Sequence, residues 1–527
     1  MTLRWPPEGS GIRRPTIARE VVATSQPLAA QAGLAMLRQG GNAVDAALAA
    51  GIALTVVEPA STGLGSDAFA LIWDGREVHA LNGSGGAPRA WTPDVLKSWA
   101  SIAPRGWNSI TVPGMVALWH DLSERFGKLP FAKLFEPAVG WAEGGFPVSP
   151  SVADRWQVQA AELASQPGFA EAYMPGGKVP AIGQIFRLPA LAQSLRDIAE
   201  TKGRTFYEGR LAEAMLSHSR AHGGLMAAED LGAHRSEWVT PLKADVLGHT
   251  LYEMPPNSQG LVVPMTLGIL AHCALDMSDL GGADSIHLQI EAFKLAAADI
   301  ARYGADPSAM PISAETLLSP DYLKSRAKLI TDRAQVYSAG LPADGGTVVV
   351  TTGDRGGMMV SLLQSNFVGF GSGVVVPDTG ISLHNRAGSF TFKEGHPNAP
   401  APGKRPLHTL LPAMVFKDGA PLVSLGVTGG NMQPQGHMQL LLRMLAANSE
   451  PQSAIEAPRY RYMADMAINL EDRIGDAVRS QLAGRGHVIK PMPPGYMDFG
   501  SAQIVYRLGE SWLAATDNRK DGAAVGW

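Results

Sequence analysis

The segment from residue 347 to residue 367 constrains the fold more than any other part of the chain. It consists of TVVVTT, the glycine-rich turn GDRGG and MMVSLLQSNF, a pattern that predicts two adjacent antiparallel strands. Their apolar residues run almost without alternation, so both faces of the strands need apolar cover. Helices packed around a buried sheet provide such cover, which favours an α/β fold.

Helices and further strands are predicted on either side of this strand pair. Residues 27–50 are rich in alanine and predict two helices separated by a Gly-Gly pair, the second with Asn42 as N-cap and Asp45 in a capping-box position. An Asp-Gly turn between AFALIWD and REVHALN predicts a hairpin. Strands are also expected in GVVVP, LLPAMVFKDG and PLVSLGV, and a helix over residues 433–447. No tandem repeat is present, so we expect one structural unit.

The composition excludes several classes of protein. An apolar fraction of 45% over 527 residues rules out a disordered or fibrous chain. A net charge of −4 without long like-charge blocks argues against nucleic acid and anionic membrane surfaces as partners. The N-terminal segment lacks the apolar core of a signal peptide, and no apolar stretch reaches the roughly 20 residues of a membrane-spanning helix. We therefore expect a soluble, cytoplasmic protein.

Sequence motifs for common cofactors are absent. The chain contains no GxxxxGK[ST], GxGxxG, HExxH or CxxC sequence. Its one cysteine, Cys273, cannot form an internal disulfide or a cysteine-based zinc site. Ser66 and Ser372 lie outside any GxSxG motif, which argues against an α/β-hydrolase. We expect neither a metal nor an organic cofactor.

The junction before Thr347 allows two interpretations. Residues 331–346 (TDRAQVYSAGLPADGG) are polar and without periodicity, which predicts a linker that ends in a Gly-Gly pair. Gly-Gly favours turns and threonine favours strands, so the junction has an ordinary structural explanation. Alternatively, the chain cuts itself before Thr347. The new α-amino group, with an ordinary pKa of about 7.7–8.0, could then act as general base toward the hydroxyl of the same residue.

Long motifs in both halves of the chain resemble the γ-glutamyltransferase family of N-terminal-nucleophile hydrolases. The first half contains GNAVDAALAAGIALTVVEPASTGLGSDAFALIWD (41–74) and ITVPGMVALWHDLSERFGKLPFAKLFEPAVGWAEGGFPVS (110–149). The second half contains SNFVGFGSGVVVPDTGISLHNR (365–386), PGKRPLHTLLPAMVFKDG (402–419) and GVTGGNMQPQG (426–436). The resemblance implies a four-layer αββα sandwich.

The resemblance also implies a proenzyme that cleaves itself. The cut is expected between Gly346 and Thr347, after attack of the Thr347 hydroxyl on the Gly346 carbonyl and hydrolysis of the resulting ester. It would yield a large subunit, residues 1–346, and a small subunit, residues 347–527. The two subunits are expected to remain one intertwined heterodimer, which could dimerise further.

Several catalytic roles follow from the same resemblance. Counting back from FGSG (370–373) places the family nucleophile on Thr347, and the residue that supports it is Ser365. The two oxyanion-hole glycines correspond to Gly429 and Gly430, whose backbone N–H groups would stabilise the tetrahedral intermediate. The positions of the family's paired serines hold the substrate-binding candidates His408 and Thr409.

The departures from the family pattern concern substrate binding. The arginine and aspartate that hold the α-carboxylate and α-amino group of a γ-glutamyl substrate are replaced by Ser84 and Ser389. Family glutamine and asparagine positions hold Arg386 and Phe367, and Val348 replaces a second threonine after the nucleophile. An unpaired substrate charge would cost several kcal/mol on binding. γ-Glutamyl transfer is therefore disfavoured.

Arg386 supplies a new cation that suits a substrate carboxylate, although it could instead be a salt-bridged structural residue. The second-half motifs resemble the branch that includes oxamate amidohydrolase and the cephalosporin-type acylases. We expect a threonine amidohydrolase for a small carboxylate-bearing amide, with oxamate as the best candidate. Asn366, Arg386, His408 and Thr409 would line its pocket, which Phe367 would narrow. A γ-glutamyltransferase or glutathione hydrolase, a glutaryl- or cephalosporin-type acylase and a non-catalytic scaffold remain alternatives.

Overall fold

A computed structural model describes residues 3–6, 12–337, 346–492 and 499–527 of the chain. Residues 338–345 of the predicted linker at 331–346 therefore lie outside the described residues, which resume at Gly346, the residue before Thr347. Within the described part, no helix combines the length and the apolar character needed to cross a membrane.

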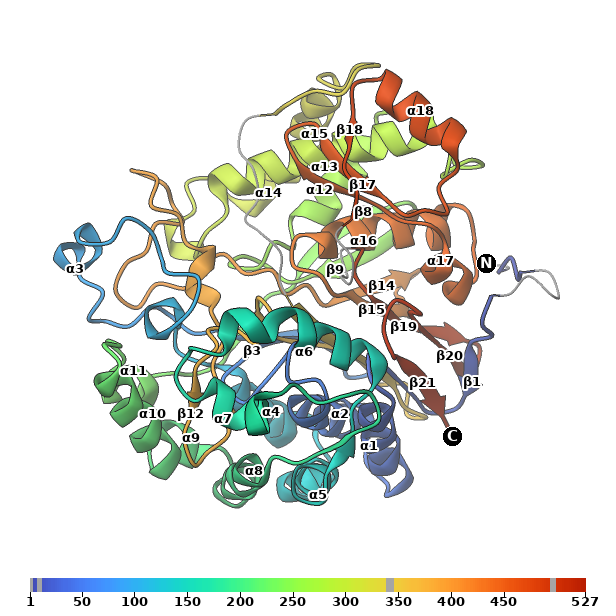
Figure 1. Ribbon diagram of the computed structural model, residues 1–527. Coiled ribbons are helices and arrows are strands. Elements are labelled where there is room, and N and C mark those ends of the chain that lie inside the picture. Colours follow the sequence, from blue (N-terminus) through green and yellow to red (C-terminus); the bar gives the residue numbers. More distant parts are fainter. Residues whose placement is uncertain (1–2, 7–11, 338–345, 493–498) are drawn as a thin grey trace.

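Two seven-stranded antiparallel sheets form the centre of the fold (Figure 1). The strands of the first sheet are, in order, β21 (Ala523–Gly526), β2 (Val21–Thr24), β10 (Gly346–Gly353), β11 (Met359–Phe367), β3 (Asp67–Trp73), β4 (Val78–Gly83) and β7 (Glu237–Val239). Those of the second sheet are β1 (Thr16–Ala18), β20 (Ser511–Thr516), β19 (Ala502–Leu508), β15 (Ala420–Val427), β14 (Ala413–Lys417), β9 (His249–Glu253) and β8 (Leu242–Val246).

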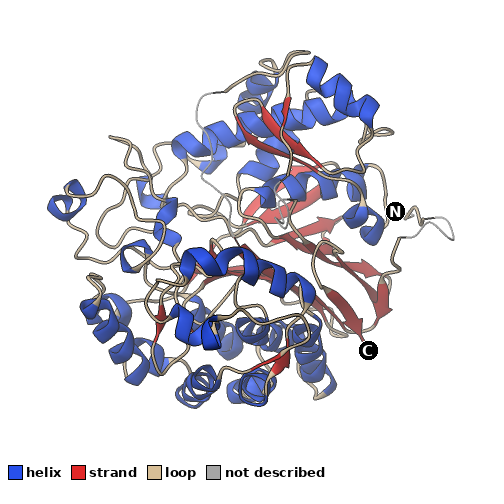
Figure 2. Cartoon of the chain, in the orientation of Figure 1, coloured by secondary structure: helices blue, strands red, loops and turns tan. Residues whose placement is uncertain are grey.

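The sheets pack face to face, and helices cover both outer faces (Figure 2). Phe69, Leu363 and Trp512 are among the buried side chains between the sheets. The outer face of the first sheet is covered by α1 (Pro27–Arg38), α2 (Ala43–Val57), α4 (Met115–Phe126) and α5 (Glu136–Gly144). The outer face of the second sheet is covered by α12 (Val262–Leu270), α13 (Ala283–Tyr303) and α16 (Met432–Leu441). The expected four-layer αββα sandwich is confirmed.

Shorter elements surround this sandwich. The remaining helices are α3 (Pro93–Lys97), α6 (Pro150–Leu163), α7 (Phe169–Tyr173), α8 (Pro189–Thr201), α9 (Arg204–Tyr207), α10 (Arg210–Ala221), α11 (Ala228–Gly232), α14 (Ala314–Leu317), α15 (Pro320–Ala327), α17 (Pro451–Glu456) and α18 (Asp476–Gly484). The remaining strands are β5 (Phe146–Pro147), β6 (Ile185–Phe186), β12 (Val375–Val376), β13 (Ile381–Ser382), β16 (Tyr460–Ala464), β17 (Ala467–Leu470) and β18 (Val488–Ile489).

Local sequence patterns account for the elements that carry the site. The Asn42 side chain accepts hydrogen bonds from the backbone of Val44 and Asp45, which completes the predicted capping box of α2. The predicted β3–β4 hairpin and the β10–β11 pair are both present. Two predictions need correction. The helix expected over 433–447 changes to a π-helical turn at Leu442–Ala446, and GVVVP forms only the two-residue β12, outside the large sheets.

Candidate active site

Thr347 lies at an irregularity in the central sheet. In the β10–β11 pair, Gly346 is opposite Phe367 but Val348 is opposite Gln364, so the register shifts at Thr347. Thr347 of β10 thereby faces two residues of β11, Ser365 and Asn366, so β11 is the bulged strand. The Thr347 side chain contacts β11 and α16, and the residue is only 1% exposed.

Three segments of the chain hold Thr347. Its Oγ1 lies 3.5 Å from Oγ of Ser365 on β11 and accepts a hydrogen bond from Nε2 of Gln433 on α16 at 3.2 Å. Its backbone carbonyl accepts a hydrogen bond from Nζ of Lys520 at 3.2 Å. Ser365 Oγ also accepts the backbone N–H of Phe367 at 2.8 Å. The hydroxyl of Thr347 is thus oriented by polar groups on two sides.

Gly429 and Gly430 form the turn between β15 and the N-terminus of α16. Their φ angles are +106° and +56°, a conformation that glycine adopts without steric cost. Among the described residues, neither backbone N–H donates a hydrogen bond. Gln259 fixes the turn, because its Nε2 donates to the carbonyl oxygens of Gly430 at 3.1 Å and Thr409 at 2.8 Å. Within the described part of the chain, the protein itself therefore leaves both N–H groups unbonded, and their role as oxyanion donors stays a prediction.

A buried carboxylate, Asp67, lies next to this hydroxyl cluster. Asp67 pairs with Ser365 across β3 and β11. Its Oδ2 accepts a hydrogen bond from Nε2 of His408 at 3.2 Å, and its Oδ1 lies 3.5 Å from Nε2 of His384. Burial opposes ionisation of Asp67, but His384 and His408 outweigh it and hold the pKa of the carboxyl well below its usual value. Asp67 is therefore a fixed negative charge.

His408 is a neutral member of this group. Burial and the neighbouring Arg386 lower its pKa to about 3. Its Nδ1 accepts the backbone N–H of Leu410 at 3.2 Å, which leaves the proton on the nitrogen that faces Asp67. His408 therefore donates to Asp67 and adds no positive charge.

Arg386 is a buried cation beside Asp67 and Thr409. It is fully buried, its guanidinium lies 4.3 Å from the centroid of the Phe367 ring, and its Nη1 donates to Oγ1 of Thr409 at 3.0 Å. Nε lies 4.0 Å from Oδ2 of Asp67, which is too long for a hydrogen bond. Burial lowers the pKa of Arg386 to about 9 against the opposing effect of Asp67, so the group is charged at neutral pH. Nε and Nη2 have no hydrogen-bond partner among the described residues.

The other predicted pocket residues have different surroundings. The carboxamide of Asn366 is occupied by the protein, because Oδ1 accepts from Ser66 Oγ at 2.8 Å and Nδ2 donates to the Pro59 carbonyl at 3.1 Å. Asn366 thus joins the end of β11 to the loop between α2 and β3. Ser84 bonds to Asn82 at 2.7 Å, whereas the buried Oγ of Ser389 has no partner in the described part of the chain.

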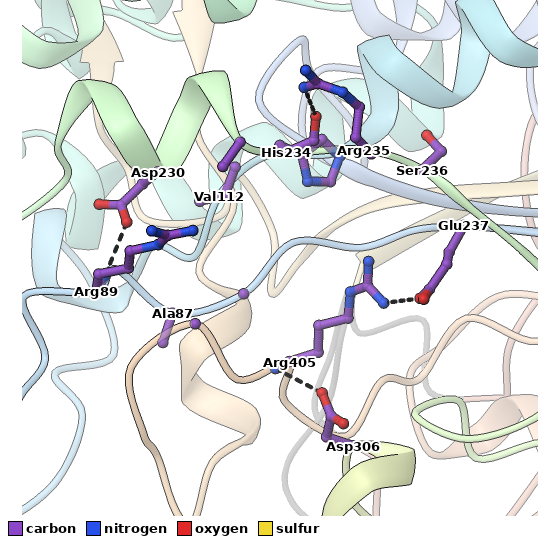
Figure 3. A pocket seen from close by; sticks show the side chains of 13 residues that line it. Ala87, Arg89, Val112, Asp230, His234, Arg235, Ser236, Glu237, Asp306 and Arg405 are labelled. Carbon is purple, nitrogen blue, oxygen red and sulfur yellow. Dashed lines mark hydrogen bonds and ion pairs between the residues drawn. The ribbon is translucent and has the colours of Figure 1, made fainter.

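Figure 3 shows a separate pocket on the outer side of this region. It has a volume of about 340 Å³ and is lined by three arginines, three acidic residues and His234, together with small and apolar residues. Arg405 connects it to the site, because its Nε donates to the backbone carbonyl of Ser84 at 3.0 Å. Its lining includes neither Thr347 nor Arg386. Its three arginines are balanced by Asp230, Glu237 and Asp306, so it offers no excess of charge to a ligand.

A possible metal-ligand group lies elsewhere in the fold. His287 and Glu291 of α13 and His487 place one ligand atom each within 4.8 Å of one another. However, His287 Nδ1 already bonds to His487 Nε2 at 2.9 Å, and Lys294 Nζ bonds to Glu291 at 2.7 Å. An ammonium group so close to the carboxylate disfavours a second cation, and the group does not contact Thr347.

Comparison with known proteins assigns the family. The family model described as Gamma-glutamyltranspeptidase matches residues 29–527. The chain belongs to the γ-glutamyltranspeptidase family. Its members are N-terminal-nucleophile hydrolases, and the chain is accordingly an amidohydrolase of this type. The resemblance inferred from the sequence motifs is thereby confirmed.

Two curated members of the γ-glutamyltranspeptidase family and one solved structure are similar over almost their entire length. The "Glutathione hydrolase-like YwrD proenzyme" of Bacillus subtilis is 37% identical over 517 residues, covering 96% of this chain and 98% of its own. The "Oxamate amidohydrolase proenzyme" of Klebsiella pneumoniae is 36% identical over 516 residues, covering 95% and 97%. The crystal structure of a cephalosporin acylase from Bacillus halodurans has a TM-score of 0.94 at 39% identity and covers 100% and 99% of the two chains.

Family motifs alone did not identify the residues that contact Thr347 or the groups next to it. None of five such residues was predicted: Gln433 and Lys520 bond to Thr347, Asp67 pairs with Ser365, His384 lies beside Asp67, and Glu58 bonds to Lys520. Asp67 had a usable signal, because an acidic residue that begins an apolar strand becomes buried when the strand is central. Gln433 had a different signal, because it lies three residues after Gly430 of the predicted oxyanion turn. Lys520 had no such signal, since it lies 173 residues from Thr347.

Proposed function

We propose that the chain is a self-cleaving threonine amidohydrolase that acts on a small amide bearing an adjacent carboxylate. Cleavage between Gly346 and Thr347 separates residues 1–346 from residues 347–527 and frees the α-amino group of Thr347. Both residues belong to β10, whose pairing with β11 on one side and β2 on the other would keep the small subunit in the first sheet after cleavage. The product is then one heterodimeric body.

The reaction proceeds through a Thr347 acyl-enzyme. Oγ1 of Thr347 attacks the amide carbonyl while the α-amino group of the same residue takes its proton. The N–H groups of Gly429 and Gly430 stabilise the oxyanion, and the proton passes to the leaving nitrogen. Water then hydrolyses the ester and regenerates the hydroxyl. For oxamate, the balanced reaction consumes one water and forms oxalate and ammonia.

The environment of Arg386 is the observation that carries the substrate assignment. A guanidinium binds a carboxylate best through two parallel N–H···O bonds, and the Nε–Nη2 edge of Arg386 has no hydrogen-bond partner among the described residues. The bond to Thr409 and the contact with Phe367 hold this edge in place. A substrate carboxylate would complete the hydrogen bonding of Arg386.

The residues around the pocket also disfavour a γ-glutamyl substrate. An α-ammonium group needs an acidic partner, and Ser389 stands at the corresponding family position. Asp67, the carboxylate nearest to Arg386, already bonds to His408 and the backbone of Gly114. Oxamate carries a carboxylate that can pair with Arg386 and no ammonium group that would need an acidic partner. The similarity to an oxamate amidohydrolase over nearly the whole chain supports this choice.

Ammonia release and product analysis on a small panel of amides test the substrate assignment. The panel contains oxamate, neutral pyruvamide as its isostere, γ-glutamyl-p-nitroanilide and a glutaryl amide of a cephalosporin nucleus. We expect the highest kcat/KM on oxamate and at least tenfold less on pyruvamide, because only oxamate pairs with Arg386. Preferred turnover of the γ-glutamyl or glutaryl compound would support the corresponding alternative and contradict the assignment.

A further inference from the structure

Lys520 is a buried lysine that touches the nucleophile. Its side chain is 2% exposed, and its Nζ donates to the Thr347 carbonyl at 3.2 Å and to Oε1 of Glu58 at 2.5 Å. Lys520 lies between β20 and β21, whereas Glu58 caps the C-terminus of α2. The lysine therefore connects the segment between β20 and β21 and the end of α2 to the backbone of Thr347.

Glu58 is held rigidly in this contact. Its Oε2 accepts a hydrogen bond from Ser25 Oγ at 2.5 Å, and its Oε1 accepts one from Ser61 Oγ at 2.7 Å. Although burial opposes ionisation, Lys520 and Arg155 lower the pKa of Glu58, so it stays a carboxylate. A charged, fully bonded carboxylate fixes the ammonium against the Thr347 backbone.

Three charged groups lie around Lys520. Glu58 comes from the C-cap of α2, Arg155 from α6, and Asp521 is the next residue in the chain. Arg155 Nη1 lies 3.9 Å from Glu58 and bonds to Ser61 Oγ at 2.7 Å, and Asp521 accepts from the backbone of Ser151 at 3.0 Å. Burial and Arg155 lower the pKa of Lys520 to about 8 against the opposing Glu58. Lys520 bonds directly to the Thr347 carbonyl, at 3.2 Å.

A cation at this position has a specific consequence for the proposed mechanism. The α-amino group of Thr347 acts as general base only when it is unprotonated, and its ordinary pKa of about 7.7–8.0 leaves most of it protonated at pH 7. The Lys520 ammonium bonds to the carbonyl of the same residue, and a like charge there disfavours the protonated amine, although the Glu58 carboxylate acts against this effect. A neutral hydrogen-bond donor would hold the Thr347 carbonyl equally well but would not change the charge of the amine.

We propose that Lys520, clamped by Glu58 against the Thr347 carbonyl, is a positioning residue that keeps the α-amino group of the mature nucleophile in its free-base form near neutral pH. The inference rests on the proposed function, because it requires cleavage before Thr347. It assigns to the C-terminal segment of the small subunit a role in setting the lower pH limit of the reaction.

The pH dependence of kcat/KM for Lys520→Met tests this role. We expect the ascending limb to move upward by about one pH unit, with about tenfold lower kcat/KM at pH 6.5 and a plateau within about threefold of the wild-type value. Lys520→Arg retains the charge and should restore the position of the limb. Lys294→Met removes another buried lysine, which pairs with Glu291 and not with Thr347, and should leave the limb unchanged.

A second measurement covers the case in which Lys520→Met does not fold or cleave. The rate at which cyanate carbamylates the Thr347 amine of the cleaved wild-type enzyme reports the pKa of that amine directly, and we expect a value below about 7. A pKa of 7.7 or above for the Thr347 amine overturns the role of Lys520. The same conclusion follows if Lys520→Met lowers kcat/KM equally at every pH and leaves the ascending limb in place. Wild-type protein that stays uncut and inactive instead contradicts the proposed function, and the inference with it.

Discussion

Nη1 of Arg386 donates a hydrogen bond to Oγ1 of Thr409 at a distance of 3.0 Å. The segment 387–408 separates the two residues in the sequence. Thr409 is in turn bonded through its carbonyl to Gln259, which also holds Gly430. One chain of contacts thus joins the guanidinium of Arg386 to the turn that contains the proposed oxyanion donors.

Replacement of Arg386 tests whether it binds a carboxylate. We expect Arg386→Gln to raise KM for oxamate about 10–100-fold, because a hydrogen-bonded charge pair contributes about 1.5–3 kcal/mol. KM for the neutral isostere pyruvamide should change less than about threefold. Initial-rate kinetics on both amides, with intact mass as a check of cleavage, make the comparison. Equal losses on both amides would assign Arg386 a structural role.

Gln433 is expected to orient the Thr347 hydroxyl. Gln433→Ala deletes one neutral hydrogen bond. Such a bond contributes about 0.5–1.5 kcal/mol, so we expect kcat to fall about two- to tenfold. Gln435→Ala is the matched control, because Gln435 lies on the same helix and bonds to Asn431 and Tyr462 instead of Thr347. If both variants lose the same activity, the bond from Gln433 has no special part in the reaction.

The Gly429 turn should tolerate no side chain. A Cβ at Gly429 would lie 3.1 Å from Cβ of Met432, and the φ of +106° disfavours any other residue. We expect Gly429→Ala to move the backbone and lower kcat about 10²–10³-fold, which is the usual cost of losing one oxyanion donor. Gly419→Ala places the same strain, at φ +79°, in an open turn and should leave kcat unchanged. Full activity of Gly429→Ala would contradict the oxyanion assignment.

The buried histidines predict how stability depends on pH. Burial lowers the pKa of His234 to about 4, below its ordinary value of 6.5. The folded state then keeps His234 neutral while the unfolded chain takes up a proton, so stability falls as the pH drops below 6.5. Each such histidine changes the free energy of unfolding by up to about 1.4 kcal/mol per pH unit. Urea unfolding between pH 7.5 and 5 should show a slope that is smaller in His234→Gln than in the wild type. An identical slope would mean that His234 is charged in the folded state.

The sequence predicts the parts of the fold that depend on residues close together in the chain. The capping box at Asn42 and Asp45, the β3–β4 hairpin and the β10–β11 pair each follow from local propensity and turn chemistry. The order of strands in the sheets does not. For example, β2 pairs with both β10 and β21, and these contacts join residues hundreds of positions apart. Family resemblance supplied the layer architecture that local patterns left open.

The candidate site divides in the same way. Thr347, Gly429 and Gly430 stand in motifs that can be recognised in the sequence. The fixed charge of Asp67 and the contact of Lys520 depend on which strands become neighbours, and only the folded chain shows them. Asn366 shows a contact that the motif alone does not reveal. Its place in the SNF motif predicts a pocket residue, and in the fold its carboxamide also bonds to Ser66 and Pro59.

The central claim is that a peptide bond breaks before Thr347 and frees the nucleophile. Intact mass spectrometry of the purified protein tests it most directly, with Thr347→Ala as the control. The account predicts two polypeptides, residues 1–346 and 347–527, from the wild type, and a single uncut, inactive chain from Thr347→Ala. An uncut wild-type chain that hydrolyses amides at full rate would contradict it.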